Sequence, residues 1–292
     1  MIFLQLLING LIAGSIYALI ASGFSFIYTT NKFVHFAHGS TVTISAYLFF
    51  WLLTFLNLPL WLAIPLVTIS AGIYGFLIHY IIYLPLKKRN SSSVILLIAS
   101  LGIMIFFDNL MQLLFGADVK ILNVFERQIG ITFLGAYITP LQIITMATVF
   151  SIFIVFWLFK KYSRLGKLMQ AVADNPELAK TSGINSINIQ HWSFIIGSAI
   201  AGLAGILIAL ENNIEPTMGT THMVSSYTGA IIGGVDSLMG SILGSYFIGI
   251  LSNFCAWFLP SSFASAFTII LLFIFLLIKP QGILGIKKGT RE

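Results

Sequence analysis

Charged residues are scarce in this 292-residue chain: Asp, Glu, Lys and Arg together make up 8% of it, while hydrophobic residues make up 58%. Soluble domains carry about 25% charged residues, so most of this chain cannot face water. Cysteine is scarcer still. The single Cys255 lies inside an apolar run and excludes an internal disulfide framework.

Motifs of soluble enzymes are also missing. The chain has no Gly-x-x-x-x-Gly-Lys-Ser/Thr loop for ATP, no His-Glu-x-x-His and no Gly-x-Ser-x-Gly. The sequence therefore predicts a protein that is not an enzyme and binds no cofactor or metal of its own. Any energy that it takes from ATP must come through a partner.

Apolar runs of roughly 20 residues, separated by short polar breaks, follow one another along the chain. Backbone groups in lipid must be hydrogen-bonded within helices or closed barrels, and these runs are too long and too uniformly apolar for barrel strands. The fold class is therefore all-α, a polytopic helical membrane protein with about eight long spans plus one short or re-entrant helix. We expect long spans at about 5–28, 34–56, 60–84, 93–115, 138–159, 190–210, 238–258 and 262–278, and the short helix at 221–235.

The basic residues indicate an orientation. Most of them fall in three polar segments, around Lys87–Arg89, Lys160–Lys180 and Lys279–Arg291, which the positive-inside rule places in the cytoplasm. The charges of the loop 116–137 balance, which fits the outer side. Counting spans from these segments predicts an N-terminus outside and a C-terminus in the cytoplasm. The first run has no basic region and no cleavage site, so we expect a retained span rather than a signal peptide.

Small residues recur at four-residue spacing in several runs, as in Gly10-x-x-x-Gly14, Gly240-x-x-x-Gly244 and Ser245-x-x-x-Gly249. Such faces let membrane helices approach closely. Helix packing is one interpretation, and the lining of a narrow path is the other. Gly233 and Gly234, at the end of the short run, belong to the same set of candidate pathway or core positions.

Ionisable groups inside membrane spans are expensive and are therefore candidate functional positions. His35 and His38 lie at the start of the second long run; hydrogen bonding where that helix starts is favoured over a metal site, because two histidines supply too few ligands. Asp108 and Asn109 lie in the fourth run. Two roles fit them there: a proton relay, or an interhelical hydrogen-bonding patch. We expect His79 and His191 to be interfacial, and Asp236 to be the N-cap of the next helix.

The segment 163–185, SRLGKLMQAVADNPELAKTSGIN, is polar and basic in an otherwise apolar chain. Its pattern predicts two short helices: apolar residues recur at helical spacing up to Val172, Asp174 or Asn175 can cap a restart at Pro176, and Gly183 ends it. A short amphipathic helix can lie on a membrane surface or fit a groove on another protein. The break, the acidic residues and the Ala-rich second helix favour the groove.

This segment resembles the cytoplasmic loop of bacterial ABC importer permeases of the branched-chain amino acid (LivH/LivM) family. The N-terminal Asn9-Gly10-Leu11 and Gly14–Leu19, and the stretch from Asn31 to Gly39, resemble the LivH branch, as do Gly233-Gly234, Gly240–Tyr246 and Lys279–Gly285. The chain departs from the family pattern at Gln170, where arginine is usual. The matching positions in the segment are Gly166, Ala171, Asp174, Ala179, Gly183, Ile184 and Asn185.

The resemblance implies a single permease domain over 1–292, with a coupling segment at 163–185, in the bacterial inner membrane. It also implies a second, related permease subunit, two ATP-binding subunits that hydrolyse ATP, and an extracytoplasmic solute-binding protein as partners. Contact with the ATPases would fall on the segment. Its coupling residues would be Arg164, Gly166, Lys167, Gln170, Ala171, Asp174, Ala179 and Gly183. A weak sequence similarity between Asn31–Tyr47 and Gly229–Tyr246 suggests that the chain has two related internal halves, at 1–115 and 138–292.

The function that follows is import of branched-chain or other neutral amino acids. The alternative is an ion-coupled secondary transporter or channel for a small polar solute such as urea, using Asp108 or the histidines; a membrane scaffold without a pathway is a third interpretation. The binding protein supplies most of the selection in such importers, so the permease sequence indicates little about the solute.

Overall fold

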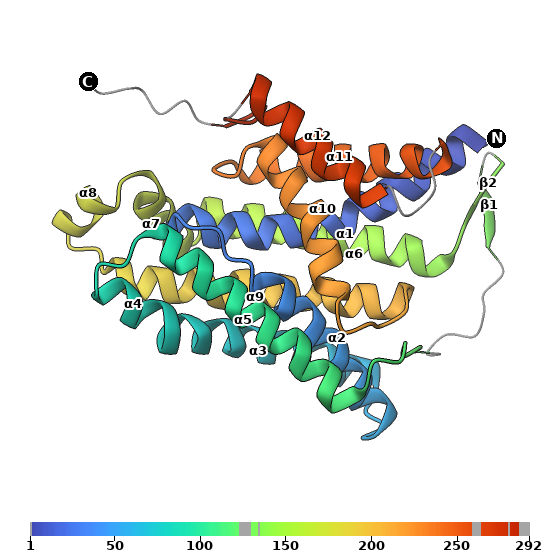
Figure 1. Ribbon diagram of the computed structural model, residues 1–292, viewed down its shortest axis with the longest axis horizontal. Coiled ribbons are helices and arrows are strands. Elements are labelled where there is room, and N and C mark those ends of the chain that lie inside the picture. The colour runs from blue at the N-terminus through green and yellow to red at the C-terminus, as the bar shows by residue number, and fades with distance from the viewer. Residues whose placement is uncertain (1, 123–129, 134, 259–263, 280, 286–292) are drawn as a thin grey trace. The chain divides into compact units, whose positions relative to one another are not determined.

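The computed structural model describes residues 2–122, 130–133, 135–258, 264–279 and 281–285 (Figure 1). Every predicted span contains a helix. The long-helix bounds are α1 Ile2–Asn31, α2 His38–Thr54, α3 Leu60–Ile78, α5 Ser93–Phe115, α6 Pro140–Tyr162, α9 Ser186–Glu211, α10 Met218–Gly233, α11 Leu238–Phe258 and α12 Ala264–Ile278. A π-helical turn at His79–Tyr83 joins α3 to α4, Leu84–Lys88. Between α6 and α9 lie α7, Arg164–Asp174, and α8, Pro176–Thr181.

Six of these helical stretches are long and apolar enough to cross a membrane within the described residues. They are Ile2–Asn31, Leu60–Lys88, Ser93–Phe115, Pro140–Tyr162, Ser186–Glu211 and Leu238–Phe258. The helices α2, α10 and α12 are shorter, with 17, 16 and 15 residues. The chain is thus a helical, multi-pass membrane protein, as the apolar runs predict.

The third span differs in length from the sequence prediction. It was expected to end near residue 84, yet the helix continues to Lys88. Pro85 has no N–H to donate to the preceding turn, and a proline inside a helix also clashes with the carbonyl four residues earlier. The π-helical turn at His79–Tyr83 directly before it changes that spacing, a common way to accommodate an irregularity inside a helix.

Residue contacts divide the chain into two units. One comprises Met1–Ser25, Phe125–Met146 and Thr221–Glu292, and the other comprises Phe26–Val124 and Ala147–Thr220. Both are therefore built from stretches far apart in sequence. The predicted internal halves, which rest on sequence similarity rather than on contacts, stay a prediction.

In the unit 26–124 plus 147–220, α9 packs closely on α2 and α3. A Cβ added at Gly205 would lie closer than 3.0 Å to the carbonyl oxygen of Val42, and one at Gly202 would meet the methyl group of Ala71 at 2.5 Å. Another at Gly75 would meet the Phe194 carbonyl oxygen at 2.7 Å. These glycines let α9 lie directly on the backbones of its neighbours, as small-residue faces do in membranes.

Close backbone contacts at glycine also hold the other unit together. A Cβ at Gly10 would lie 2.5 Å from the Cα of Ile250, and one at Gly14 would lie 2.9 Å from that of Tyr246, so α1 and α11 cross at their backbones. Further along α11, Gly240 and Gly244 lie equally close to the backbone of Gly233 in α10. The candidate pathway or core glycines of this unit are thus in mutual backbone contact.

The C-terminal residues of this unit hydrogen-bond to the end of α10. The Ile283 N–H donates to the Ile232 carbonyl at 2.8 Å, and the Leu284 N–H donates to that of Gly233 at 2.9 Å. Gly234, at φ 111°, and Gly282, at φ 81°, take backbone conformations that favour glycine. Two separate sequence motifs, Gly233-Gly234 and Gln281–Gly285, therefore meet.

A short hairpin of the same unit lies before α6. Its strands β1, Ile131–Phe133, and β2, Ala136–Ile138, pair antiparallel with Ile131 opposite Ile138. The Gln5 side chain in α1 bonds both backbone groups of Tyr137: it accepts from the N–H at 2.7 Å and donates to the carbonyl at 3.0 Å. This anchors the hairpin to the start of α1.

Asp236 is not the cap that the sequence predicted. The helix α11 begins at Leu238, and the hydroxyl of Ser237 accepts from the Gly240 N–H at 3.2 Å, three residues on. That is the geometry of an N-cap serine. Serine and aspartate are comparable caps, so composition alone could not decide between adjacent positions.

We expect Gly205→Ala to destabilise the protein by about 1–3 kcal/mol, the usual cost of forcing an extra methyl group into a close-packed contact. Gly102→Ala is the matched control, because a Cβ at Gly102 in α5 meets nothing within 4 Å. The measurement is the midpoint of thermal unfolding of the purified protein in detergent. Equal midpoints for the two variants would contradict this account of the α2–α9 contact.

Candidate functional site

The segment 163–185 forms the two short helices that the sequence predicts. The hydroxyl of Ser163 caps α7 by accepting from the Gly166 N–H at 2.9 Å. Gly166 is needed for a different reason: a Cβ there would lie 2.6 Å from the carbonyl oxygen of Phe159 in α6. Glycine at 166 therefore lets α7 fold back against the end of the preceding span.

The break between α7 and α8 is held by Asn175. Its side-chain oxygen accepts from the N–H groups of Glu177 and Leu178 at 3.1 and 3.0 Å, and Pro176 occupies the first helical position. Of the two caps that the sequence allowed, the structure uses Asn175, because Asp174 still belongs to α7. The predicted stop and restart is confirmed.

Gly183 ends α8 in a Schellman motif. It has φ 83°, its N–H donates to Lys180, and the Ile184 N–H donates to Ala179, at 3.1 and 3.0 Å. Asn185 then caps α9 by accepting from the Ile187 and Asn188 N–H groups. Since α7 also packs on α9, the segment is held to the first turns of α9 at both of its helices.

The predicted coupling residues divide into two groups. Gly166 and Ala179 are buried and serve the packing of the segment, together with Met169 and Val172, while Ala171 is half-buried. The exposed members are Arg164, Lys167, Gln170, Asp174 and Gly183. An open, mainly polar face with both signs of charge is therefore available on the side away from the protein.

Two leucines on this open face were not predicted as contact residues. Leu178 in α8 is 64% exposed and Leu168 in α7 is 37% exposed. When an amphipathic helix docks into a groove on another protein, its exposed apolar side chains are the anchors of that contact. The sequence carried a signal for Leu178, because it is the one large apolar residue in Pro176–Thr181.

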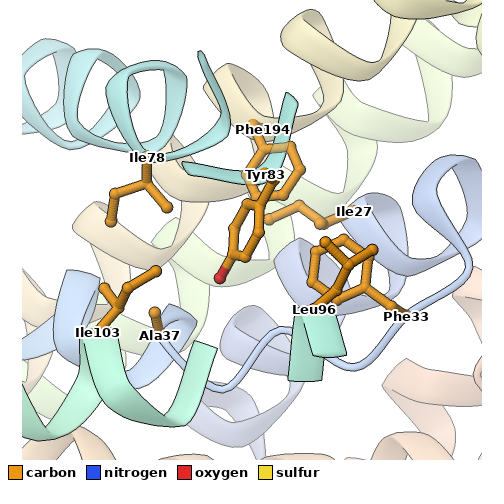
Figure 2. Packing of buried hydrophobic residues seen from close by; sticks show 8 residues of the cluster. All are labelled: Ile27, Phe33, Ala37, Ile78, Tyr83, Leu96, Ile103 and Phe194. Atoms are coloured by element: carbon orange, nitrogen blue, oxygen red, sulfur yellow. The ribbon is translucent and has the colours of Figure 1, made fainter. Parts of the chain in front are cut away.

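The predicted histidines at the start of α2 lie in the interior of their unit. His35 Nδ1 is 2.8 Å from the hydroxyl of Tyr83, and both rings pack against Phe194. His38 is buried in the first turn of α2. Figure 2 shows the apolar cluster to which Tyr83 belongs, in which Phe33, Tyr83 and Phe194 come from three separate parts of the chain.

Asp108 and Asn109, adjacent in sequence, face different surroundings. The Thr220 hydroxyl donates to Asp108 Oδ2 at 2.8 Å, which links α5 to the first turn of α10. Asn109 is exposed and donates to the Ile105 carbonyl of its own helix at 2.7 Å. Gly219, next to Thr220, is in turn bonded through its N–H to the Thr43 hydroxyl at 3.1 Å. Asp108 thus belongs to an interhelical polar patch, one of the two arrangements that the sequence allowed.

The position of His79 relative to the membrane interface stays a prediction. Within the protein, His79 is fully buried, the helix continues nine residues beyond it, and its Nδ1 lies 2.8 Å from Nδ1 of His191 in α9. His191 is partly buried at the same contact. Nothing in the sequence pairs residues 112 positions apart.

Lys87 is a further residue that the sequence analysis misjudged. It was grouped with Lys88 and Arg89 as a loop charge, yet those two are exposed while Lys87 is partly buried and donates to Asn31 and Gln190. Asn31 had been noted only as part of a motif. Within the described residues, no three His, Cys, Asp or Glu side chains come together as metal ligands.

Comparison with known proteins gives a consistent result. The family model described as "Branched-chain amino acid transport system / permease component" matches residues 6–278. The chain is 31% identical to the high-affinity branched-chain amino acid transport system permease protein LivH of Escherichia coli K12, over 97% of this chain and 96% of that protein. It is also 31% identical to the corresponding protein BraD of Pseudomonas aeruginosa, with the same coverage.

One solved structure, PsaBC from Streptococcus pneumoniae in complex with Fab, is similar over 94% of this chain and 90% of that chain, with a TM-score of 0.49 at 17% identity. That likeness is too weak to support any statement about the fold. The family model and the relatives cover nearly the whole chain. The chain belongs to the branched-chain amino acid transport permease family, as a LivH-type member.

Proposed function

We propose that this chain is the membrane permease subunit of an ATP-driven, binding-protein-dependent importer of the inner membrane, carrying branched-chain or other neutral amino acids. Its partners are a second, related permease subunit, two ATP-binding subunits that hydrolyse the ATP, and an extracytoplasmic solute-binding protein. Family membership supports the transport role, and the names of LivH and BraD support the solute class. In this proposal the chain crosses the membrane with about eight long spans and one short one, from an outer N-terminus to a cytoplasmic C-terminus.

The observation that carries the proposal is the geometry of α7 and α8. Their buried faces are fixed to α6 and α9 by Gly166 and by capping residues, and their open face presents Leu178 among charged residues. A rigid, amphipathic helix pair that leaves one face unpartnered is suited to a groove on another protein. Because the chain has no P-loop of its own, the ATPase subunits are the partner that this face would meet.

The direct test is uptake by the purified complex in liposomes. The permease pair, the ATPases and the binding protein are reconstituted, and uptake of labelled leucine is followed with ATP enclosed. We expect uptake that requires both ATP and the binding protein. Uptake that instead follows a proton or sodium gradient without ATP would overturn the proposal.

We expect Leu178→Glu to weaken ATPase binding by about tenfold or more, corresponding to 1.4 kcal/mol or more, because it places a second acid beside Glu177 and removes the apolar anchor. Co-purification of the ATPases and ATP-driven uptake measure the effect. Val119→Glu is the matched control, since Val119 is also exposed, at 47%, but lies outside segment 163–185. An unchanged Leu178→Glu complex would show that α8 is not in the contact.

A carboxylate inside a membrane helix, Asp108, favours a second candidate function, an ion-coupled transporter. In a proton relay, Asp108 must gain and lose a proton. In a structural role, it need only accept the hydrogen bond from the Thr220 hydroxyl. We expect Asp108→Asn to keep ATP-driven uptake within about twofold, since its amide oxygen still accepts that hydrogen bond. Asp108→Leu would lose a bond worth about 0.5–1.5 kcal/mol and lower the unfolding midpoint. Abolished uptake in a stable Asp108→Asn protein would favour the ion-coupled mechanism.

A further inference from the structure

One side-chain amine joins three helix ends in the unit 26–124 plus 147–220. Lys87 Nζ donates to Asn31 Oδ1 at 2.6 Å and to Gln190 Oε1 at 3.0 Å. Asn31 is the last residue of α1, Lys87 lies at the end of the helix that continues α3 through α4, and Gln190 lies in the second turn of α9. The ring of Phe33 covers the amine at 5.5 Å.

The same three helix ends have further contacts at this point. Asn31 Nδ2 donates to the Ser193 hydroxyl at 3.1 Å, and the Thr30 hydroxyl donates to that of Ser193 at 2.7 Å. The histidine contact between His79 and His191 adds a second link between the α3 side and α9. We call the set Lys87, Asn31 and Gln190 the lysine clasp.

The lysine clasp holds helices together at a cost in free energy. The described contacts of Lys87 are with two neutral amide oxygens and an aromatic ring, and none is with a carboxylate. Withdrawing an amine from water without a counter-charge costs free energy. Bonds to neutral acceptors are also weaker than an ion pair and easier to exchange. A link of this kind suits helix ends that separate and rejoin.

The position of Gln190 connects the clasp to segment 163–185. The segment is followed directly by α9, whose first turn is capped by Asn185, and α7 packs on the same helix. Gln190 lies one turn beyond that cap. A displacement of α7 and α8 would therefore move the first turns of α9, including Gln190. The hydrogen bond between Gln190 and Lys87 would then move Lys87 as well.

We propose that Lys87 is a positioning residue of the transport cycle: the lysine clasp transmits movement of segment 163–185 to the ends of α1 and α4, and it opens and closes during each cycle. The inference rests on the proposed function, since it takes the segment to be the contact with the ATPases. It assigns a role to three residues outside that contact.

The experiment uses the complete reconstituted complex and measures leucine uptake and ATP hydrolysis together. For Lys87→Met we expect uptake per ATP hydrolysed to fall about tenfold, within the range of typical coupling between sites, while the ATPases still co-purify. Lys87→Arg keeps a donor for both oxygens and is expected to restore most of the ratio. Lys88→Met is the matched control, because Lys88 is adjacent and exposed.

Gln190→Glu tests the opening of the clasp in the other direction. A carboxylate at 190 turns the contact with Lys87 into an ion pair and strengthens that link, while it gives up the weak hydrogen bond that Gln190 Nε2 donates to the Thr30 carbonyl at 3.5 Å. We expect uptake and ATP hydrolysis to fall together, by about fivefold, with an unfolding midpoint at or above that of the wild type. A purely structural role for Lys87 predicts no loss of turnover from a stronger bond.

The outcomes separate the two proposals. If the wild-type complex shows no ATP-driven uptake, the proposed function fails. If the wild type transports and either Lys87→Met keeps the wild-type ratio or Gln190→Glu keeps the wild-type turnover, the clasp is wrong and the proposed function stands. Should Lys87→Met fail to assemble, Gln190→Glu decides alone, provided that its unfolding midpoint stays at or above that of the wild type: it leaves Lys87 in place, gains an ion pair and loses only the 3.5 Å bond to the Thr30 carbonyl.

Discussion

In lipid, helices gain little from covering apolar surface, because the acyl chains they leave are as apolar as the side chains they meet. Contact between helices must then come from close fit and from hydrogen bonds. In this chain the close fit is made at glycine: Gly202 and Gly205 bring α9 onto its neighbours, and Gly10 and Gly14 bring α1 onto α11. A single methyl group at such a position would meet backbone or a neighbouring side chain, so the arrangement of each unit depends on the absence of side chains there.

Once the backbones are that close, the polar groups have defined places. His35 reaches Tyr83, Asp108 receives the Thr220 hydroxyl, and Lys87 reaches two helix ends. These bonds lie where helices begin or end, or where two of them cross, and none is isolated on an apolar surface facing lipid. Segment 163–185 differs in kind, since its own caps and a glycine contact hold it in place while one face stays open.

Much of this could be predicted from the sequence, because the signals are local. Run length predicted where the long helices lie, and Asn175, Pro176 and Gly183 predicted the form of α7 and α8. The small-residue spacing predicted close helix contact but not which helices meet, since periodicity describes one helix at a time. The pairing of His79 with His191, the partners of Lys87 and the contact of residues 283–284 with α10 join positions 50 or more apart, and no local pattern encodes them. The π-helical turn was missed because the third run was expected to end near residue 84, whereas the helix continues to Lys88.

The division into two units has a consequence for biosynthesis. The unit 26–124 plus 147–220 has all of its residues once the ribosome has passed position 220, and it can pack while the rest is still being made. The other unit combines α1 with α11 and α12, which are translated much later. The face of α1 that carries Gly10 and Gly14 therefore has no partner helix until Tyr246 and Ile250 of α11 have been translated. During that interval α1 is the part of the chain most in need of protection by the insertion machinery.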